Sequence, residues 1–503
     1  MSLPDPRQAR RFRFVRRDYE NGVATLVYAF DEGPELIERI TFPDAPALTE
    51  QRGDAFEAAL DLLHLVAGVS YYKAGVPAEI AVETGALDVA IAEFLDALYL
   101  HGLGEFAYQN KLDLRRRIAF LPLAQGASFL PPSQGEDNAL LPPLQGEGRG
   151  GDGVDATSNT ANTNTIPTQT LPLKGRALEA PSLKGLASVQ SLPRRTLVPI
   201  GGGKDSLVSV ELLKSANDPA TAVWVGNSPL IEACAQRTGL PMLNIRRDLS
   251  PLLFEYNKQG AYNGHIPVTA INSAILAVAA ILYGFDAIAF SNERSASSAT
   301  LEYEGQPVNH QWSKGWEFER GFHALLKSHV AADLDYFSLL RPLSELAVAE
   351  RFARTSRYDD VFSSCNRNFR ILGPKPADRW CGQCPKCHFV FLALGVFMPK
   401  PRLLAIFGRN LLDDIALAPA FDALMEYGDH KPFECVGEGI ESRAAMAALA
   451  ARAEWREDAI VARFAEEIAP QLDAKQLALA PLLVSHGEHR IPARLEALVD
   501  AHR

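Results

Sequence analysis

The sequence predicts an α/β protein whose central part is a doubly wound parallel sheet. Two observations lead to this fold class: apolar runs alternate with helical segments, and a glycine-rich turn follows the first run. The runs and the segments between them lie at 197–200, 207–213, 220–225, 240–245, 271–283 and 287–290. Strands and helices that alternate in this way form βαβ units, which build a parallel sheet with helices on both faces.

Four regions follow one another along the chain. We expect an N-terminal α+β domain at 1–125, a disordered linker or insertion at 126–193, the sheet domain at 194–409 and a helical C-terminal region at 410–503. In the first region, a strand is predicted at 24–30 and helices at 49–66 and 88–100. The linker contains a glycine-rich stretch at 146–153 and a polar stretch at 157–165. Such a sequence buries too little apolar surface to offset its ordering entropy.

Composition limits the class of protein. Of the 503 residues, 47% are hydrophobic and 22% charged, as in ordinary globular proteins. The formal net charge of −11 disfavours a protein that grips nucleic acid by its phosphates. No apolar segment typical of a secretory signal follows the N-terminus, and the longest apolar stretches fall short of the roughly 20 residues that span a bilayer. We expect a cytoplasmic protein without a nucleic-acid or membrane partner; the sequence does not indicate its oligomeric state.

A glycine loop follows the first strand of the predicted sheet. It consists of Gly201, Gly202, Gly203, Lys204, Asp205 and Ser206. Glycines let backbone amides approach an anion, and the next helix adds the partial positive charge of its N-terminus. Asp205 or Ser206 is expected to cap that helix, and an acidic side chain beside a polyphosphate calls for Mg²⁺. A turn without a ligand is the other interpretation. A Walker A loop is excluded, because Lys204 is followed by Asp205 rather than Ser or Thr.

The loop resembles the S-G-G-x-D-S motif of the PP-loop ATP pyrophosphatase family, whose fold is of the adenine nucleotide alpha hydrolase-like type. The resemblance implies that Gly201–Ser206 binds ATP and Mg²⁺, and that AMP and pyrophosphate are released with the help of Asp205 and Ser206. Gly201 stands where the family usually has serine, which removes one hydroxyl donor. The segment Arg341–Glu350 is similar to the P-L-x-x-L-x-x-x-E segment of the family, in which Arg341 could reach a phosphate. A loop entering an amphipathic helix explains the same segment.

Four cysteines have the spacing of a metal site. They are Cys365, Cys381, Cys384 and Cys387. Four thiolates fit a tetrahedral, structural Zn²⁺ site, with His388 as a possible substitute for one ligand. An iron–sulfur cluster and free buried thiols are the alternatives. The same order of cysteines occurs in the 7-cyano-7-deazaguanine synthases, which are PP-loop enzymes.

Three polar runs in the sheet domain are candidates for the substrate site. They lie at 263–273, 291–297 and 308–315, and the second directly follows the strand at 287–290. Ligands of open α/β sheets bind beyond the carboxyl ends of the strands. His265 and His310 are candidate general bases, although a single histidine is more often a packed or capping residue. Glu293 and Arg294 are candidates for an ion pair.

Longer stretches resemble one family along most of the chain. The runs at 63–73, 264–273, 291–295, 309–314 and 431–437 are similar to the bacterial UDP-N-acetylmuramoyl-L-alanyl-L-glutamate epimerases. That family uses ATP and Mg²⁺ to invert the terminal L-glutamate of UDP-MurNAc-L-Ala-L-Glu to D-glutamate for peptidoglycan precursor synthesis. Adenylation removes the charge of the glutamate carboxylate and so makes the α-proton acidic enough for a base of near-neutral pKa.

The proton-transfer groups remain open among His265, His310 and Cys435. A thiolate can carry such a proton, and a buried structural cysteine is the alternative. A PP-loop enzyme that forms an amide, nitrile or thio group on a nucleobase or tRNA is the competing function. The cysteine spacing favours it, and the pI near 5.6 disfavours tRNA. A non-catalytic nucleotide sensor is less consistent with the intact Asp205 and Ser206.

Overall fold

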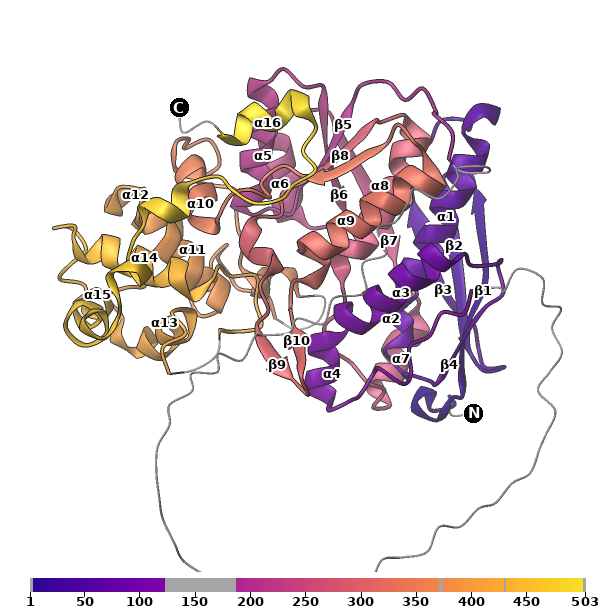
Figure 1. The fold of residues 1–503 in the computed structure, drawn as a ribbon, viewed down its shortest axis with the longest axis horizontal. Helices are drawn as coiled ribbons and strands as arrows, with labels where there is room; N and C mark the ends of the chain where they lie inside the picture. The colour runs from indigo at the N-terminus through magenta and orange to yellow at the C-terminus, as the bar shows by residue number, and fades with distance from the viewer. Residues whose placement is uncertain (1–2, 123–186, 371–373, 429–430, 501–503) are drawn as a thin grey trace, which may run out of the picture. The chain divides into compact units, whose positions relative to one another are not determined.

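A nine-stranded mixed sheet forms the centre of the fold, in the order β11-β8-β5-β6-β7-β3-β2-β1-β4 (Figure 1). The structure is a computed structural model that describes residues 3–122, 187–370, 374–428 and 431–500. The strands are β1 (Arg11–Glu20), β2 (Val23–Phe30), β3 (Leu36–Thr41), β4 (Glu79–Val82), β5 (Thr196–Pro199), β6 (Ala220–Val225), β7 (Met242–Asp248), β8 (Ala287–Phe290) and β11 (Asp335–Ser338). Strands β11, β8, β5, β6 and β7 are parallel, which confirms the predicted α/β class for this half.

The N-terminal strands extend the same sheet instead of forming a sheet of their own. Strand β3 pairs antiparallel with β7 through Ile40 and Arg247, and β1, β2 and β3 continue antiparallel. The buried Glu38 accepts from Arg247 at 2.7 Å across this junction. Residues 1–122 therefore cluster with 187–503 into one unit. The sequence did not predict this pairing, because contacts between distant segments leave no local pattern.

Helices cover both faces of the sheet. On one face lie α1 (Gly53–Ala67), α2 (Val69–Tyr72), α3 (Val89–Gly102), α8 (Val268–Tyr283) and α9 (Trp316–Leu325), and on the other α5 (Lys204–Ser215), α6 (Pro229–Thr238), α10 (Glu345–Ala353), α11 (Pro385–Gly395) and α14 (Gly439–Ala450). Successive side chains of a strand point to opposite faces. Leu197 thus joins the first core and Val198 the second.

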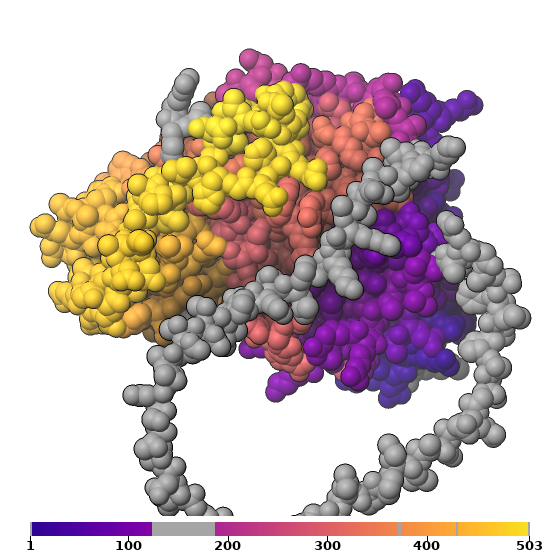
Figure 2. All heavy atoms as spheres, in the orientation of Figure 1, coloured from indigo at the N-terminus to yellow at the C-terminus, as the bar shows by residue number. Residues whose placement is uncertain are grey.

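The remaining elements are short. They are α4 (Gly104–Asn110), α7 (Pro251–Lys258), α12 (Lys400–Phe407), α13 (Ala418–Leu424), α15 (Ala459–Arg463), α16 (Ala493–Asp500) and the hairpin β9 (Leu301–Tyr303)–β10 (Gln306–Val308). The predicted helical character after 410 is confirmed. Figure 2 shows the C-terminal residues, in yellow, running along the upper left of the view, and Arg351 donates to the Val499 carbonyl at 3.0 Å.

Most of the predicted linker 126–193 lies outside the described residues. Its last residues are described and bound: Ala187 donates to the Ser328 carbonyl at 3.0 Å and Gln190 to Asp333 at 2.7 Å. The described chain thus resumes at residue 187, before the predicted start of the sheet domain at 194. In the described part of the chain, no helix is long and apolar enough to cross a membrane.

Candidate functional site

The glycine loop joins the end of β5 to the start of α5, as predicted. Gly202 has φ +83°, and a Cβ at Gly203 would lie 2.6 Å from the Ser364 Oγ, so the turn depends on glycine at both positions. The expected cap was wrong: Gly203 is the N-cap, no side chain caps the helix, and Ser206 Oγ donates back to the Gly203 carbonyl at 3.2 Å. No side chain therefore occupies the first backbone N–H groups of α5, which are the donors that an anion site needs.

Buried ion pairs hold the end of the glycine loop in place. The Lys204 ammonium is buried and pairs with both Asp205 and Glu345. Burial alone would lower the pKa of Lys204, but the two carboxylates raise it above its ordinary value. Burial likewise opposes ionisation of Glu345, yet Lys204 and Lys386 lower its pKa to about 2. Asp205 keeps 27% of its side chain exposed, so it is the member of this group that can reach a metal–phosphate complex.

A second group of side chains, the Cys435 cluster, contains Glu105, His265, His310, Lys314 and Cys435. Lys314 Nζ donates to Cys435 Sγ at 3.1 Å, and His310 lies close enough to the same cysteine to lower its pKa. Glu105 contacts His310 Nδ1 and lies 3.8 Å from His265 Nδ1. The two histidine rings are 4.3 Å apart between centroids. The structure thus brings together the three residues that the sequence left open for proton transfer.

The charges in this cluster determine one another. Burial raises the pKa of Cys435, but Lys314, His310 and Lys386 outweigh it and bring the pKa to about 5. Burial lowers the pKa of His310, but Cys435 and Glu105 raise it to about 9. The pKa of His265 falls to about 3 through burial and the positive charges of His310 and Lys314. At neutral pH the cluster therefore holds a thiolate, an imidazolium and a neutral imidazole.

The loop and the Cys435 cluster belong to one site. Lys386 donates to the carbonyl of Cys435 and lies 3.4 Å from Glu345, which pairs with Lys204 of the loop. Lys314, which binds the Cys435 sulfur, is also stabilised in its charged form by Asp205. A substrate carboxylate beside a nucleotide on the loop would therefore lie next to the cluster.

Polar residues follow β8, as predicted. Ser291 Oγ donates to Ser209 Oγ at 2.7 Å, and Glu293 accepts from the Ala296 amide at 2.9 Å. Burial, with the nearby negative charges of Glu345 and Asp205, raises the pKa of Glu293 to about 7. The described contacts do not include an ion pair between Glu293 and Arg294. Arg294 donates instead to the Pro342 carbonyl at 3.2 Å.

Arg341 supports the site from inside the protein. It is 3% exposed, and its guanidinium donates to Glu319 at 2.7 Å, to the Glu293 carbonyl at 2.8 Å and to the Lys314 carbonyl at 2.5 Å. All three of its guanidinium nitrogens have protein acceptors, and its contact with a phosphate stays a prediction. The segment after it enters helix α10, which Ser344 caps at 3.0 Å.

The four predicted cysteines converge. Their sulfurs lie within 4.8 Å of one another, with 3.8 Å between Cys381 and Cys387 and 3.4 Å between Cys384 and Cys387. A tetrahedron of Zn–S bonds of about 2.3 Å separates its sulfurs by about 3.8 Å, so the donor set fits Zn²⁺. His388 is not a member of this converging group, and its Nε2 faces the Gly382 carbonyl at 3.2 Å. Three of these cysteines frame the first turn of α11.

Sequence reasoning missed four residues of this site: Glu105, Lys314, Glu345 and Lys386. Lys314, Glu345 and Lys386 lay in stretches already singled out, namely a polar run, the segment Arg341–Glu350 and the cysteine motif. Glu105 lay in the N-terminal region and carried no signal, since its role depends on contacts more than 150 residues away.

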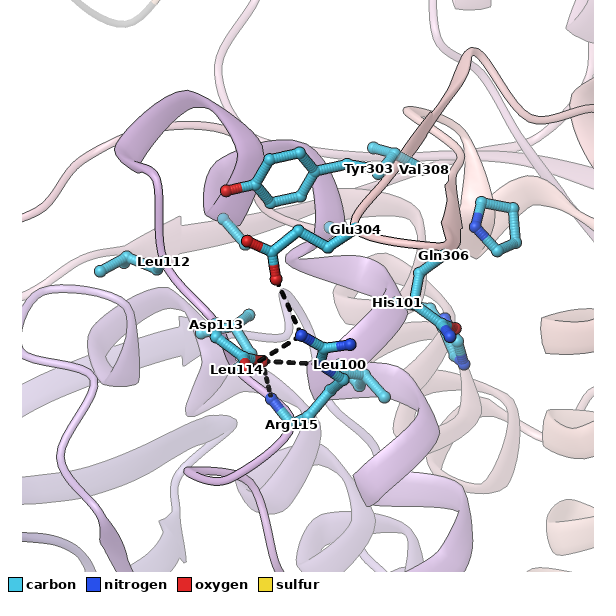
Figure 3. A pocket seen from close by; sticks show the side chains of 13 residues that line it. Leu100, His101, Leu112, Asp113, Leu114, Arg115, Tyr303, Glu304, Gln306 and Val308 are labelled. Carbon is cyan, nitrogen blue, oxygen red and sulfur yellow. Dashed lines mark hydrogen bonds and ion pairs between the residues drawn. The ribbon is translucent and has the colours of Figure 1, made fainter. Parts of the chain in front are cut away.

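A small pocket lies between α3, α4 and the β9–β10 hairpin (Figure 3). Residues of α3, α4, the following loop and the β9–β10 hairpin line it, and Arg115 bridges Asp113 and Glu304 at 2.8 Å each. Gly104 and Val308, on its two walls, are close in sequence to Glu105 and His310. The pocket volume of about 60 Å³ is well below the roughly 300 to 1,000 Å³ of ligand pockets, so this pocket does not by itself account for a substrate site.

Comparisons with known proteins agree over the whole chain. The MurL N-terminal domain matches residues 3–152 and 161–339, and the MurL C-terminal domain matches 361–479. A protein of Xanthomonas oryzae pv. oryzae is 53% identical, covering 100% of this chain and 99% of its own. One from a Micromonospora species is 37% identical, covering 97% of this chain and 98% of its own. Both relatives are named UDP-N-acetyl-alpha-D-muramoyl-L-alanyl-L-glutamate epimerase.

Proposed function

Because the chain belongs to the family of UDP-N-acetyl-alpha-D-muramoyl-L-alanyl-L-glutamate epimerases, which are isomerases, we propose that it inverts the terminal glutamate of UDP-MurNAc-L-Ala-L-Glu in peptidoglycan precursor synthesis. We further propose that it does so by adenylating the glutamate carboxylate at a PP-loop, with release of pyrophosphate and AMP. The bridging of the glycine loop to the Cys435 cluster by Glu345 and Lys386 carries this proposal.

The loop supplies the first half of the reaction. Free amides at the start of α5 and the helix dipole favour the β- and γ-phosphates. Asp205 and Ser206 would face the same anion, and Mg²⁺ bound through Asp205 would neutralise phosphate charge. Lys204 is tied to Glu345 beneath the loop, so we assign it to holding Asp205 rather than to direct contact with ATP.

The Cys435 cluster supplies the second half. Removing an α-proton next to a carboxylate would place two negative charges side by side, and adenylation removes the first of them. The cationic groups Lys314 and His310 then stabilise the enolate oxygen that forms as the proton leaves. His265, His310 and Cys435 all lie where they can exchange that proton.

The cysteine quartet contributes to the site by positioning Lys386. Lys386 lies between Cys384 and Cys387 at the start of α11 and reaches both Glu345 and the Cys435 carbonyl. Zn²⁺ held by Cys365, Cys381, Cys384 and Cys387 would fix this turn of the helix. With four protein ligands, such an ion takes no part in the chemistry.

Incubation with ATP, Mg²⁺ and UDP-MurNAc-L-Ala-L-Glu in D₂O tests the function. We expect AMP, pyrophosphate and an inverted glutamate that carries deuterium at its α-carbon. ADP as the product would contradict the PP-loop assignment. AMP without deuterium would favour an amide- or thio-forming enzyme, and the absence of any turnover would favour a nucleotide sensor.

A further inference from the structure

Glu105, His310 and Cys435 form a line of three side chains. Glu105 is on α4, His310 precedes the turn Trp312–Lys314, and Cys435 precedes α14. The Glu105 carboxylate contacts Nδ1 of His310, and His310 and Cys435 lie close enough to shift each other's pKa values. In acyl transfer by cysteine nucleophiles, an imidazole activates the thiol and a carboxylate orients the imidazole. The three side chains stand in this order.

We propose that Cys435 is a nucleophile that takes the glutamyl acyl group from the acyl-adenylate, so that the α-proton is exchanged on a thioester. This inference rests on the proposed function. The thiolate attacks the acyl carbon, a C–S bond forms, and the C–O bond to AMP breaks with its electron pair leaving on AMP. After the proton exchange, water attacks the same carbon, a C–O bond forms, the C–S bond breaks and the thiolate returns. Both protons of that water pass to solvent.

The surroundings of Cys435 favour the thiolate. Lys314 Nζ donates to the sulfur at 3.1 Å, and Lys386 holds the cysteine in place through its carbonyl. These cations and His310 outweigh the effect of burial and lower the pKa of Cys435 to about 5. Cys234 shows what burial does without such partners: it lies against the Gly202 carbonyl, and burial raises its pKa to about 12.

The same charges suit a nucleophile better than a base. A general base works best when its pKa is near the operating pH. Each unit by which the pKa falls costs a base a full unit of proton affinity, whereas thiolate nucleophilicity falls by only about 0.4 to 0.5 log units. Lys314 and His310 therefore reduce the basicity of Cys435 far more than its ability to attack a carbonyl carbon.

Acylation would also prepare the histidines for the next step. His310 keeps its proton because Cys435 and Glu105 are negative. Once the sulfur carries an acyl group, one of these two charges is gone and the proton of His310 becomes easier to remove. The neutral His265 lies 4.3 Å away, ring to ring, and its pKa is depressed partly by that same proton. The cluster thus gains a usable base after the substrate is bound to sulfur.

Rapid acid quenching of the full chain with ATP, Mg²⁺ and UDP-MurNAc-L-Ala-L-Glu tests this proposal by mass spectrometry of its peptides. We expect an ATP-dependent adduct with the mass of the substrate less one water, located on Cys435 and released by neutral hydroxylamine. Cys234 is the internal control and stays unmodified. An adduct of this kind on another residue would overturn the assignment of Cys435.

Single turnovers of Cys435→Ala and Cys435→Ser decide the case if the thioester is too short-lived to trap. A nucleophile is needed before AMP can leave, so AMP release and α-deuterium should both fall, by about a thousandfold. AMP release at the wild-type rate with deuterium lost would show that Cys435 only carries a proton. Wild-type protein that makes no AMP would instead contradict the proposed function. Circular dichroism confirms that each variant is folded.

Discussion

The glycine loop and the Cys435 cluster differ in how the chain builds them, although they form one site. The loop is a single run, Gly201–Ser206, between a strand and a helix. The cluster gathers side chains from four places, at Glu105, His265, residues 310–314 and Cys435. A phosphate site needs backbone amides in a fixed order, which one short segment supplies. A proton-transfer site needs groups whose charges set one another's pKa values, and these can come from distant segments.

The Asp205→Asn substitution should give a larger effect than changes at Glu105 or in the cysteine quartet, and it tests the loop by itself. Asparagine keeps the size of the side chain but removes the charge that would hold Mg²⁺ against the phosphates. We expect kcat for AMP formation and for deuterium exchange to fall together by at least about a hundredfold, or roughly 2.7 kcal/mol of barrier. Single-turnover assays of both products measure this loss.

Asp360→Asn is the matched control, because Asp360 is exposed and pairs only with Arg237 among its described contacts. That variant should retain turnover within about twofold, as surface substitutions usually do. If Asp205→Asn itself retains turnover within about tenfold, the metal and phosphate role of Asp205 is wrong.

The same contrast explains how much the sequence could predict. The parallel strands, α5 and the cysteine quartet were predictable, because each depends on local periodicity or spacing. The pairing of β3 with β7 and the contact of Glu105 with His310 were not, because they join segments about 200 residues apart. The capping role of Asp205 and Ser206 was wrong for a further reason. Those side chains lie one and two residues inside the helix, while the cap position falls on Gly203.

The Glu105→Gln substitution tests the cluster and should give an intermediate effect. Without the carboxylate, His310 binds its proton less tightly, and a less charged His310 stabilises the Cys435 thiolate less. The pKa of Cys435 should therefore rise from about 5 towards its ordinary value of 9.0. We expect the midpoint of a pH profile of Cys435 alkylation by iodoacetamide to move upward, and kcat to fall by about thirtyfold.

Glu304→Gln is the control for that experiment, since Glu304 lies on the pocket wall and pairs with Arg115. Its alkylation midpoint should match that of the unmodified chain. A Glu105→Gln profile that does not move would show that Glu105 does not position His310, even if the variant turns over slowly. Aspartate keeps the negative charge on a shorter side chain. The midpoint of Glu105→Asp should therefore lie between those of the unmodified chain and of Glu105→Gln.

The smallest effect on the chemistry should come from the cysteine quartet, because it holds Lys386 in place and supplies no group to the reaction. We expect the purified chain to hold about one zinc ion, and Cys381→Ser to lose most of it while Cys234→Ser keeps it. Freed from its metal, the first turn of α11 would hold Lys386 less firmly against Glu345 and the Cys435 carbonyl. Turnover should then fall by only about tenfold, and the melting temperature by several degrees. Zinc analysis by mass spectrometry and thermal melts measure both.

A second zinc ion per chain would point to Glu105, His265 and His310, whose ligand atoms lie within 4.8 Å of one another. Such an ion would replace the proton that His310 shares with Cys435, so finding it would rule out the thiolate–imidazolium pair.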